Sequence, residues 1–207
     1  MRQETLLKII ELMRKNLDIG LTILQISKRL KIGYAPAHNH ITEMEKEGII
    51  KASKIGNSKQ CRLNLENSKT RNLLQEMDIK RKEQIYTKNP KLKSILEVLI
   101  LKLNEKYISE ILSIILFGSY AKGTASKKSD IDLIFILNNL RDKHIRGAIE
   151  MECASYQYSH NIKISPLMIN VAEFKKMLRS RELNVGKETK EFGISLYGHE
   201  LFWRLIE

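Results

Sequence analysis

The sequence is poor in the residues that cross-link small secreted proteins and has no segment that would span a membrane. Among its 207 residues only two are cysteines, three are prolines and one is tryptophan. Cys61 and Cys153 lie far apart, so they provide neither a metal-binding spacing nor a disulfide framework, as is usual in a reducing cytoplasm. No uncharged apolar run reaches about 18 residues, and the charged start MRQETLLKIIELMRKN does not resemble a signal peptide. These absences predict a folded cytoplasmic protein without a membrane span.

Acidic residues are scarce relative to basic ones. The chain has 36 Lys and Arg against 24 Asp and Glu, a formal net charge of +12. Residues 1–89 carry 18 basic and 10 acidic side chains, whereas residues 90–207 carry 18 and 14. A basic N-terminal half indicates either a polyanionic partner or a lysine-rich solvated surface, and charge alone does not choose between them.

The first 66 residues show the order helix, short helix, turn, helix, hairpin. Apolar residues at helical spacing in ETLLKIIELMRKNL predict the first helix. Thr22 is placed to cap a short second helix, and Pro36 suits the first turn of a third helix that Gly48 ends. Two strand-like runs, residues 50–55 and 59–65, flank the turn signal GNS.

The stretches LTILQISKRLKIGYAPAHNHITEMEKEGII and KASKIGNSKQCRLNL carry a resemblance. On them, residues 1–66 resemble the winged helix-turn-helix domains of prokaryotic transcription regulators, in which the third helix enters the major groove. The resemblance implies that four residues of the third helix face double-stranded DNA: Tyr34, His38, Asn39 and Thr42. It also implies that four basic residues of the hairpin contact phosphates: Lys51, Lys54, Lys59 and Arg62. We expect a homodimer that reads two half-sites; the alternative is a winged helix used only for protein contacts.

A second domain follows a short join. Residues 67–90 are predicted to form a helical linker, and Asn89-Pro90 marks its end. Residues 91–207 then begin with a helix whose apolar side chains recur at helical spacing. The whole chain is therefore predicted to be an α/β (α+β) protein of two domains.

The stretch ILFGSYAKGTASKKSDIDLIFI carries the strongest chemical signal. An apolar strand ends at Gly118-Ser119, and a polar loop leads to a second strand that starts with Asp130 and Asp132. Side chains alternate along a strand, so these two carboxylates point the same way and are able to share Mg²⁺. Glycine lets a phosphate approach the backbone, and Ser119 adds a hydroxyl and an N–H donor. This interpretation requires that no lysine or arginine of the chain permanently occupies the acids.

Two other motifs fit this stretch less well. Gly118 and Gly123 have the spacing of a P-loop, but Thr124 stands where that motif needs lysine. A calcium loop lacks its central glycine and its distal glutamate.

Residues 91–207 resemble the nucleotidyltransferase fold of the DNA polymerase beta superfamily, and GSYAKGTASKKSDIDL is most similar to its minimal archaeal and bacterial members, some of which are antitoxins. The resemblance implies a mixed β-sheet flanked by helices. It implies that Gly118 and Ser119 hold a nucleoside triphosphate and that Asp130 and Asp132 bind Mg²⁺ for transfer of the nucleotide to an acceptor hydroxyl. Lys122, in the loop over the phosphates, is expected to contact the nucleotide, whereas Lys127 and Lys128 suit a solvated surface.

One family feature is missing. The family's third carboxylate lies on a later strand, which here corresponds to NIKISPLMIN, residues 161–170. This segment contains no acid, and Ser165 takes the expected position. Loss of a general base lowers a rate by about 10²- to 10⁴-fold, so binding of Mg²⁺ and nucleotide is expected even where transfer is weak.

Three functions fit these patterns. The first is a DNA-binding transcription regulator whose second domain binds, and transfers, a nucleotide. The second is an active nucleotidyltransferase that modifies a protein or a small molecule, including an antitoxin with a toxin-like protein partner. The third is an interaction protein with both folds and neither activity.

Overall fold

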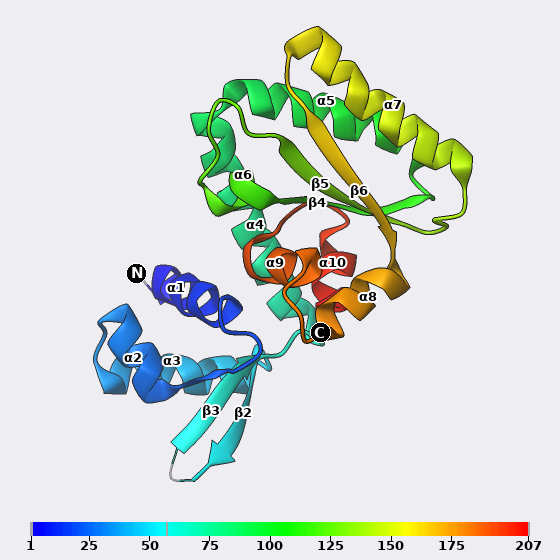
Figure 1. Ribbon diagram of the computed structural model, residues 1–207. Coiled ribbons are helices and arrows are strands. Elements are labelled where there is room, and N and C mark those ends of the chain that lie inside the picture. The colour runs from blue at the N-terminus through cyan, green and yellow to red at the C-terminus, as the bar shows by residue number, and fades with distance from the viewer. Residues whose placement is uncertain (1, 57, 207) are drawn as a thin grey trace. The chain divides into compact units, whose positions relative to one another are not determined.

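The computed structural model describes residues 2–56 and 58–206. The chain divides into two compact units (Figure 1), one up to Met77 and the other Asp78–Ile206. The division falls within one long helix, α4 (Ser68–Lys88), inside the segment predicted as a helical linker. No helix among the described residues is both long and apolar enough to cross a bilayer.

The first unit has the predicted order of helix, short helix, helix and hairpin, with one short strand, Leu21–Thr22, that was not predicted. Its elements are α1 (Arg2–Arg14), β1 (Leu21–Thr22), α2 (Ile23–Leu30), α3 (Tyr34–Lys46), β2 (Ile50–Ile55) and β3 (Ser58–Leu63). The strands form an antiparallel sheet in the order β1-β3-β2. Asn57, the middle residue of the predicted hairpin turn, lies outside the described residues.

Local chemistry explains where these helices start and stop. Thr22 caps α2 in a capping box, because its hydroxyl accepts from the Gln25 N–H while the Gln25 side chain accepts from the Thr22 N–H. Gly48 has φ +71° just beyond α3, a conformation that favours glycine. Ala37, Ile41 and Met44 are the buried residues of α3, as their spacing predicts.

The second unit contains the remaining elements. Its helices are the end of α4, then α5 (Pro90–Tyr107), α6 (Gly118–Lys122), α7 (Lys143–His160), α8 (Val171–Arg179), α9 (Val185–Phe192) and α10 (His199–Leu205). Its strands are β4 (Ile111–Phe117), β5 (Ile131–Leu137), β6 (Ile164–Asn170) and β7 (Ile194–Tyr197).

A mixed four-stranded sheet organises this unit, which confirms the predicted fold. The strand order is β6-β5-β4-β7, with β5 and β6 parallel and the other pairs antiparallel. Helices α5 and α7 cover one face, and α8, α9 and α10 lie against the other (Figure 1). Because both faces are covered, β5 is a continuous apolar run after Asp132.

A buried polar cluster ties the end of α4 to the last elements of the chain. Asp78 is fully buried and accepts from the indole Nε1 of Trp203 at 3.0 Å and from the Ser195 N–H at 3.4 Å. Arg81 donates to the carbonyl oxygens of Phe192 at 2.6 Å and Gly193 at 2.8 Å. These bonds fix α9 and β7, which lie beside the predicted nucleotide site.

Candidate active site and nucleic-acid interface

The two predicted metal ligands lie together at the start of β5. Asp130 immediately precedes the strand and Asp132 is its second residue, with Ile131 fully buried between them. Both aspartates are partly exposed, and their charges repel each other. The structure therefore brings the two carboxylates close together at the start of the strand.

Gly118 forms the other wall of the site. It follows β4 directly and has φ +66°. A Cβ built on it would lie 2.1 Å from Oδ2 of Asp132, closer than any non-bonded contact allows. Both the backbone conformation and the close approach of Asp132 thus require glycine here. Ser119, the next residue, is partly buried, and its carbonyl oxygen accepts from the Thr124 N–H at 2.9 Å.

A cation of the chain already lies at the acids. Lys163 Nζ is 2.5 Å from Oδ2 of Asp130, and the Ser165 hydroxyl lies 3.5 Å from the same oxygen. The Lys163 side chain is 63% exposed and that of Asp130 is 38% exposed. An exposed ion pair of this kind contributes little to stability. Sequence reasoning missed this lysine, because no motif includes the residue before β6.

The Asp132 carboxyl gives up its proton less readily than an ordinary aspartate does. Burial raises the pKa of its carboxyl above the usual 3.8, and the negative charges of Asp130 and Glu188 raise this pKa further. Lys163 and Lys122 lower the same pKa, and their opposition does not cancel the rise. The nearby lysines do not balance the negative charge of the two carboxylates, so this pair of oxygen donors suits a hard divalent cation.

Lys122 is held by α9. Its Nζ lies 3.0 Å from Oε1 of Glu188 and 5.6 Å from the centroid of the Phe192 ring. The charge of Lys122 also lowers the pKa of the Asp132 carboxyl, so this predicted nucleotide-binding lysine belongs to the same site as the aspartates. Glu188, 56 residues after Asp132 in the chain, has no sequence signal that would have placed it here.

A cavity of about 400 Å³ adjoins α6, the short helix that ends at Lys122. Its charged lining residues are all cationic: Arg81, Lys88 and Lys122. Gln84, Asn89 and Tyr120 add amide and phenol groups to the lining. This volume lies within the range of small-molecule sites, roughly 300–1,000 Å³, and the charges suit an anionic ligand.

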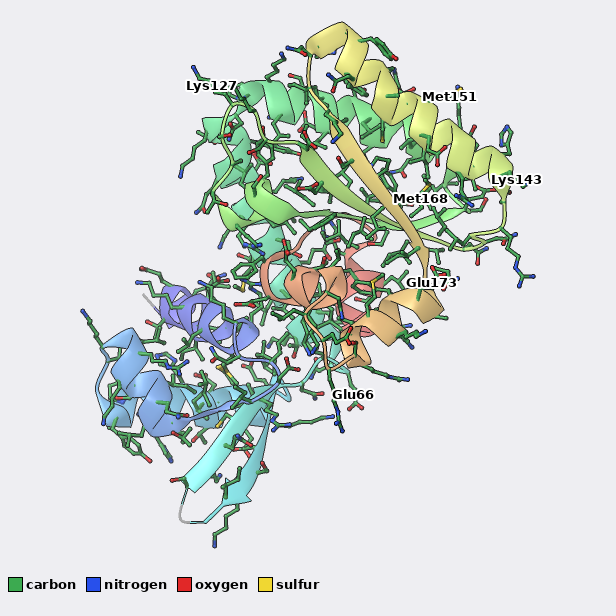
Figure 2. All side chains as sticks on the ribbon, in the orientation of Figure 1. Glu66, Lys127, Lys143, Met151, Met168 and Glu173 are labelled. Atoms are coloured by element: carbon green, nitrogen blue, oxygen red, sulfur yellow. The ribbon has the colours of Figure 1, made fainter. Side chains whose placement is uncertain are left out.

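The next strand supplies no acid to the site. In the parallel pairing of β5 and β6, Ser165 lies opposite Asp132. Figure 2 labels Glu173 at the far end of β6, where its carboxylate accepts from the Asn170 N–H at 3.2 Å and caps α8. Lys127 lies on the outward loop between α6 and β5 (Figure 2), as expected of a solvated residue.

The predicted groove-facing residues lie on one accessible face of α3. His38, Asn39 and Thr42 line a concave surface of about 700 Å³ along that helix. Tyr34 is 54% exposed, and its ring centroid lies 6.2 Å from that of His38. Side chains so arranged on an exposed helix are able to reach base edges in a major groove.

The hairpin presents the four predicted basic residues to solvent. Lys51, Lys54, Lys59 and Arg62 are all exposed. Lys51 pairs with Glu66, and Lys59 lies 3.6 Å from Glu45. Exposed pairs of this kind are weak, so they leave these lysines able to meet phosphates.

Comparison with known protein families agrees with both halves. The family described as "Polymerase beta, Nucleotidyltransferase" matches residues 97–188. The family described as "Winged helix-turn-helix DNA-binding" matches residues 2–51. The chain therefore combines an N-terminal winged helix-turn-helix with a nucleotidyltransferase domain.

Two curated relatives come from Methanocaldococcus jannaschii. "Putative protein adenylyltransferase MJ1305" is 38% identical over 80 residues, which are 38% of this chain and 54% of that protein. "Putative protein adenylyltransferase MJ0141" is 28% identical over 102 residues, which are 47% of this chain and 95% of that protein. The chain thus spans about half the length of MJ1305.

Two solved structures show a weak likeness. A toxin-antitoxin with AMP-PNP has a TM-score of 0.37 and 25% identity, covering 53% of this chain and 83% of that chain. A mutant of the toxin-antitoxin MntA-HpeT has a TM-score of 0.34 and 20% identity, covering 52% and 81%.

Proposed function

We propose that this protein is a DNA-binding regulator whose nucleotidyltransferase domain binds Mg²⁺ and a nucleoside triphosphate and transfers the nucleotidyl group to a hydroxyl. The observation that carries the proposal is the convergence of Asp130, Asp132 and Gly118 at the ends of two neighbouring strands. In the winged-helix half, the exposed face of α3 and the basic hairpin support double-stranded DNA as the partner. A homodimer is the expected form, since winged-helix regulators commonly read paired half-sites.

The donor set fits Mg²⁺. Among residues 2–56 and 58–206, no group of three or more His, Cys, Asp or Glu side chains is placed to hold a metal ion. Mg²⁺ is commonly held by one or two carboxylates, with water and substrate phosphates completing its shell. Asp130 and Asp132 would supply the two carboxylates, and the bound ion would neutralise charge on the phosphates during transfer.

The chain's own groups have distinct tasks in this proposal. Gly118 allows the phosphates to approach the backbone, and Ser119 offers its hydroxyl and N–H to them. Lys122 balances negative charge on the phosphates. The acceptor oxygen bonds to the α-phosphorus, the bond from that phosphorus to the pyrophosphate oxygen breaks, and the hydroxyl proton passes to solvent. The Ser165 hydroxyl opposite Asp132 is no general base, so slow transfer is expected.

The second candidate function is the transfer of an adenylyl group to a protein hydroxyl. Similarity to the two proteins named as adenylyltransferases favours this candidate. A toxin-like protein partner would then supply the modified residue.

Transfer is tested with nucleoside triphosphates labelled at the α-phosphate. In the presence of Mg²⁺, the wild-type chain should attach label to protein in a form that survives denaturation, and Asp130→Asn should abolish it. Glu105→Gln, an exposed substitution on α5, is the matched control and should leave labelling unchanged. Labelling that persists in Asp130→Asn would contradict the assigned site.

DNA binding is tested by the salt dependence of affinity for duplex DNA. Lys54→Ala should weaken binding to all sequences and reduce the magnitude of the salt slope by about 1. Lys8→Ala, on α1 outside the predicted DNA face, is the control. Equal effects of the two substitutions would show that net charge, and not the hairpin, is responsible.

A further inference from the structure

Lys163 is held beside the acids by the sheet itself. Its carbonyl oxygen accepts from the Ile131 N–H at 2.8 Å, in the parallel pairing that aligns Ile131 with Ile164. Ile131 is the residue between the two aspartates. The backbone of Lys163 is therefore fixed next to both carboxylates, whatever its side chain does.

The side chain of Lys163 contacts one acid and influences both. Its ammonium lies 2.5 Å from Asp130. A lysine ammonium carries a full positive charge at neutral pH, and its charge also acts on Asp132. Here it occupies Oδ2 of Asp130, one of the two oxygens that this carboxylate offers to a metal ion.

Lysine and a divalent cation exclude each other at this oxygen. Mg²⁺ binds through oxygen ligands and is repelled by an ammonium group. The exposed, flexible stem of Lys163 allows the ammonium to leave. Once displaced, it remains tethered within a few ångströms of the site, where a triphosphate would offer new anionic partners.

We infer that Lys163 is an exchangeable counter-cation of the metal site and a further ligand of the triphosphate. It neutralises Asp130 in the absence of metal, yields that carboxylate to the divalent cation, and then contacts the phosphates. This inference rests on the proposed binding of Mg²⁺ and nucleotide, and assigns Lys163 as a residue that couples the two.

The inference predicts that removal of the Lys163 ammonium changes the affinities for the metal ion and for the triphosphate in opposite directions. Lys163→Met frees Asp130, so the metal alone should bind about two- to fivefold more tightly, the range for loss of an exposed ion pair. The same substitution removes a cation from the phosphates, so the triphosphate with saturating Mg²⁺ should bind about three- to tenfold more weakly. A residue with only a structural role would not produce this divergence.

The experiment measures the two ligands separately. Binding of Mn²⁺ alone, as a spectroscopic substitute for Mg²⁺, is followed by the electron paramagnetic resonance signal of the free ion. Binding of ATP with saturating Mg²⁺ is followed by calorimetry. Lys163→Arg keeps the charge and should retain near wild-type triphosphate affinity without gaining affinity for Mn²⁺. Lys106→Met is the control for the lost charge. Lys106 lies near the end of α5, close in sequence to the start of β4, whereas Gly118 follows the other end of β4. Emission of the buried Trp203 verifies that each variant is folded.

The outcomes separate this inference from the proposed function. Opposite shifts in Lys163→Met, with Lys106→Met unchanged, support the exchange. If the wild-type chain binds both ligands and Lys163→Met behaves like Lys106→Met, the inference alone is overturned. If Mn²⁺ binds only after Lys163 is removed, the lysine occupies the carboxylate permanently, and the proposed exchange is overturned. If neither ligand binds to any variant, the proposed function fails, and the inference fails with it.

Discussion

Gly118→Ala tests whether the turn after β4 is built around the metal-binding aspartate. The glycine has φ +66°, and an added Cβ would meet Oδ2 of Asp132 at 2.1 Å and Cγ at 2.9 Å. Gly123, at the other end of α6, has φ +74° and nothing within 4 Å of an added Cβ. The two glycines therefore share the backbone demand, and only Gly118 adds the steric conflict.

The expected cost follows from these two terms. A residue with a Cβ in the left-handed region costs about 1–2 kcal/mol, and this cost applies to both Gly118→Ala and Gly123→Ala. At Gly118 the Asp132 side chain must also rotate away from its preferred geometry, at about 0.5–1.5 kcal/mol more. The rotated carboxylate no longer points to the predicted metal position, so we expect metal affinity to fall at least about tenfold, which corresponds to about 1.4 kcal/mol.

Urea unfolding followed by tryptophan emission provides the stability measurement. The chain has a single tryptophan, Trp203, and it is fully buried in the second unit, so its signal reports that unit. Mn²⁺ binding by each folded variant provides the second measurement. Gly118→Ala should lose more stability than Gly123→Ala and should lose metal binding, which Gly123→Ala retains. Metal binding that survives Gly118→Ala, or that both variants lose equally, would refute the reasoning.

Three further predictions concern Asp132, Asp78 and the two cysteines. Burial and neighbouring charges raise the pKa of Asp132, so the folded chain binds this proton more tightly than the unfolded chain does. The free energy of unfolding should therefore fall as the pH rises from 3.8 through the raised pKa. Asp132→Asn should remove that fall in urea titrations over this pH range. Asp78→Ala leaves buried donors without an acceptor, so urea unfolding should show a loss of about 3–5 kcal/mol, and a smaller loss in Asp78→Asn would identify the carboxylate's shape as the main contribution. Burial raises the pKa of Cys61 to about 11 and that of Cys153 to about 12, so a thiol reagent at neutral pH should label neither until urea unfolds the chain; rapid labelling of the folded protein would contradict their burial.

The local elements of the first unit were predictable because their signals are local. Thr22 and Gln25 form a capping box within one turn of chain, and the positive φ of Gly48 needs only a glycine after a helical pattern. The buried positions of α3 follow the 3.6-residue period. Such features depend on neighbours a few residues away, so sequence reasoning identified them before any tertiary contact was known.

The core of the candidate site was also predictable. Gly118, Asp130 and Asp132 belong to one short stretch whose strand–loop–strand pattern predicted which residues meet, although the loop begins with the unpredicted short helix α6. The two acids are two residues apart at the start of β5, and the two-residue period of a strand predicts that they share a side. The sequence also indicated that the β6 position would hold no acid, and the pairing of Ser165 with Asp132 agrees.

What the sequence determined by itself is thus the order of elements, the strand-bounded pair of aspartates and the glycine beside them, because each depends on short-range periodicity and turn chemistry. Only the tertiary structure decided which partners these groups have. Lys163 meets Asp130 from 33 residues away, and Trp203 meets Asp78 from 125 residues away. Such pairs depend on sheet register and helix packing, which are set by the burial of many side chains at once and not by any local pattern.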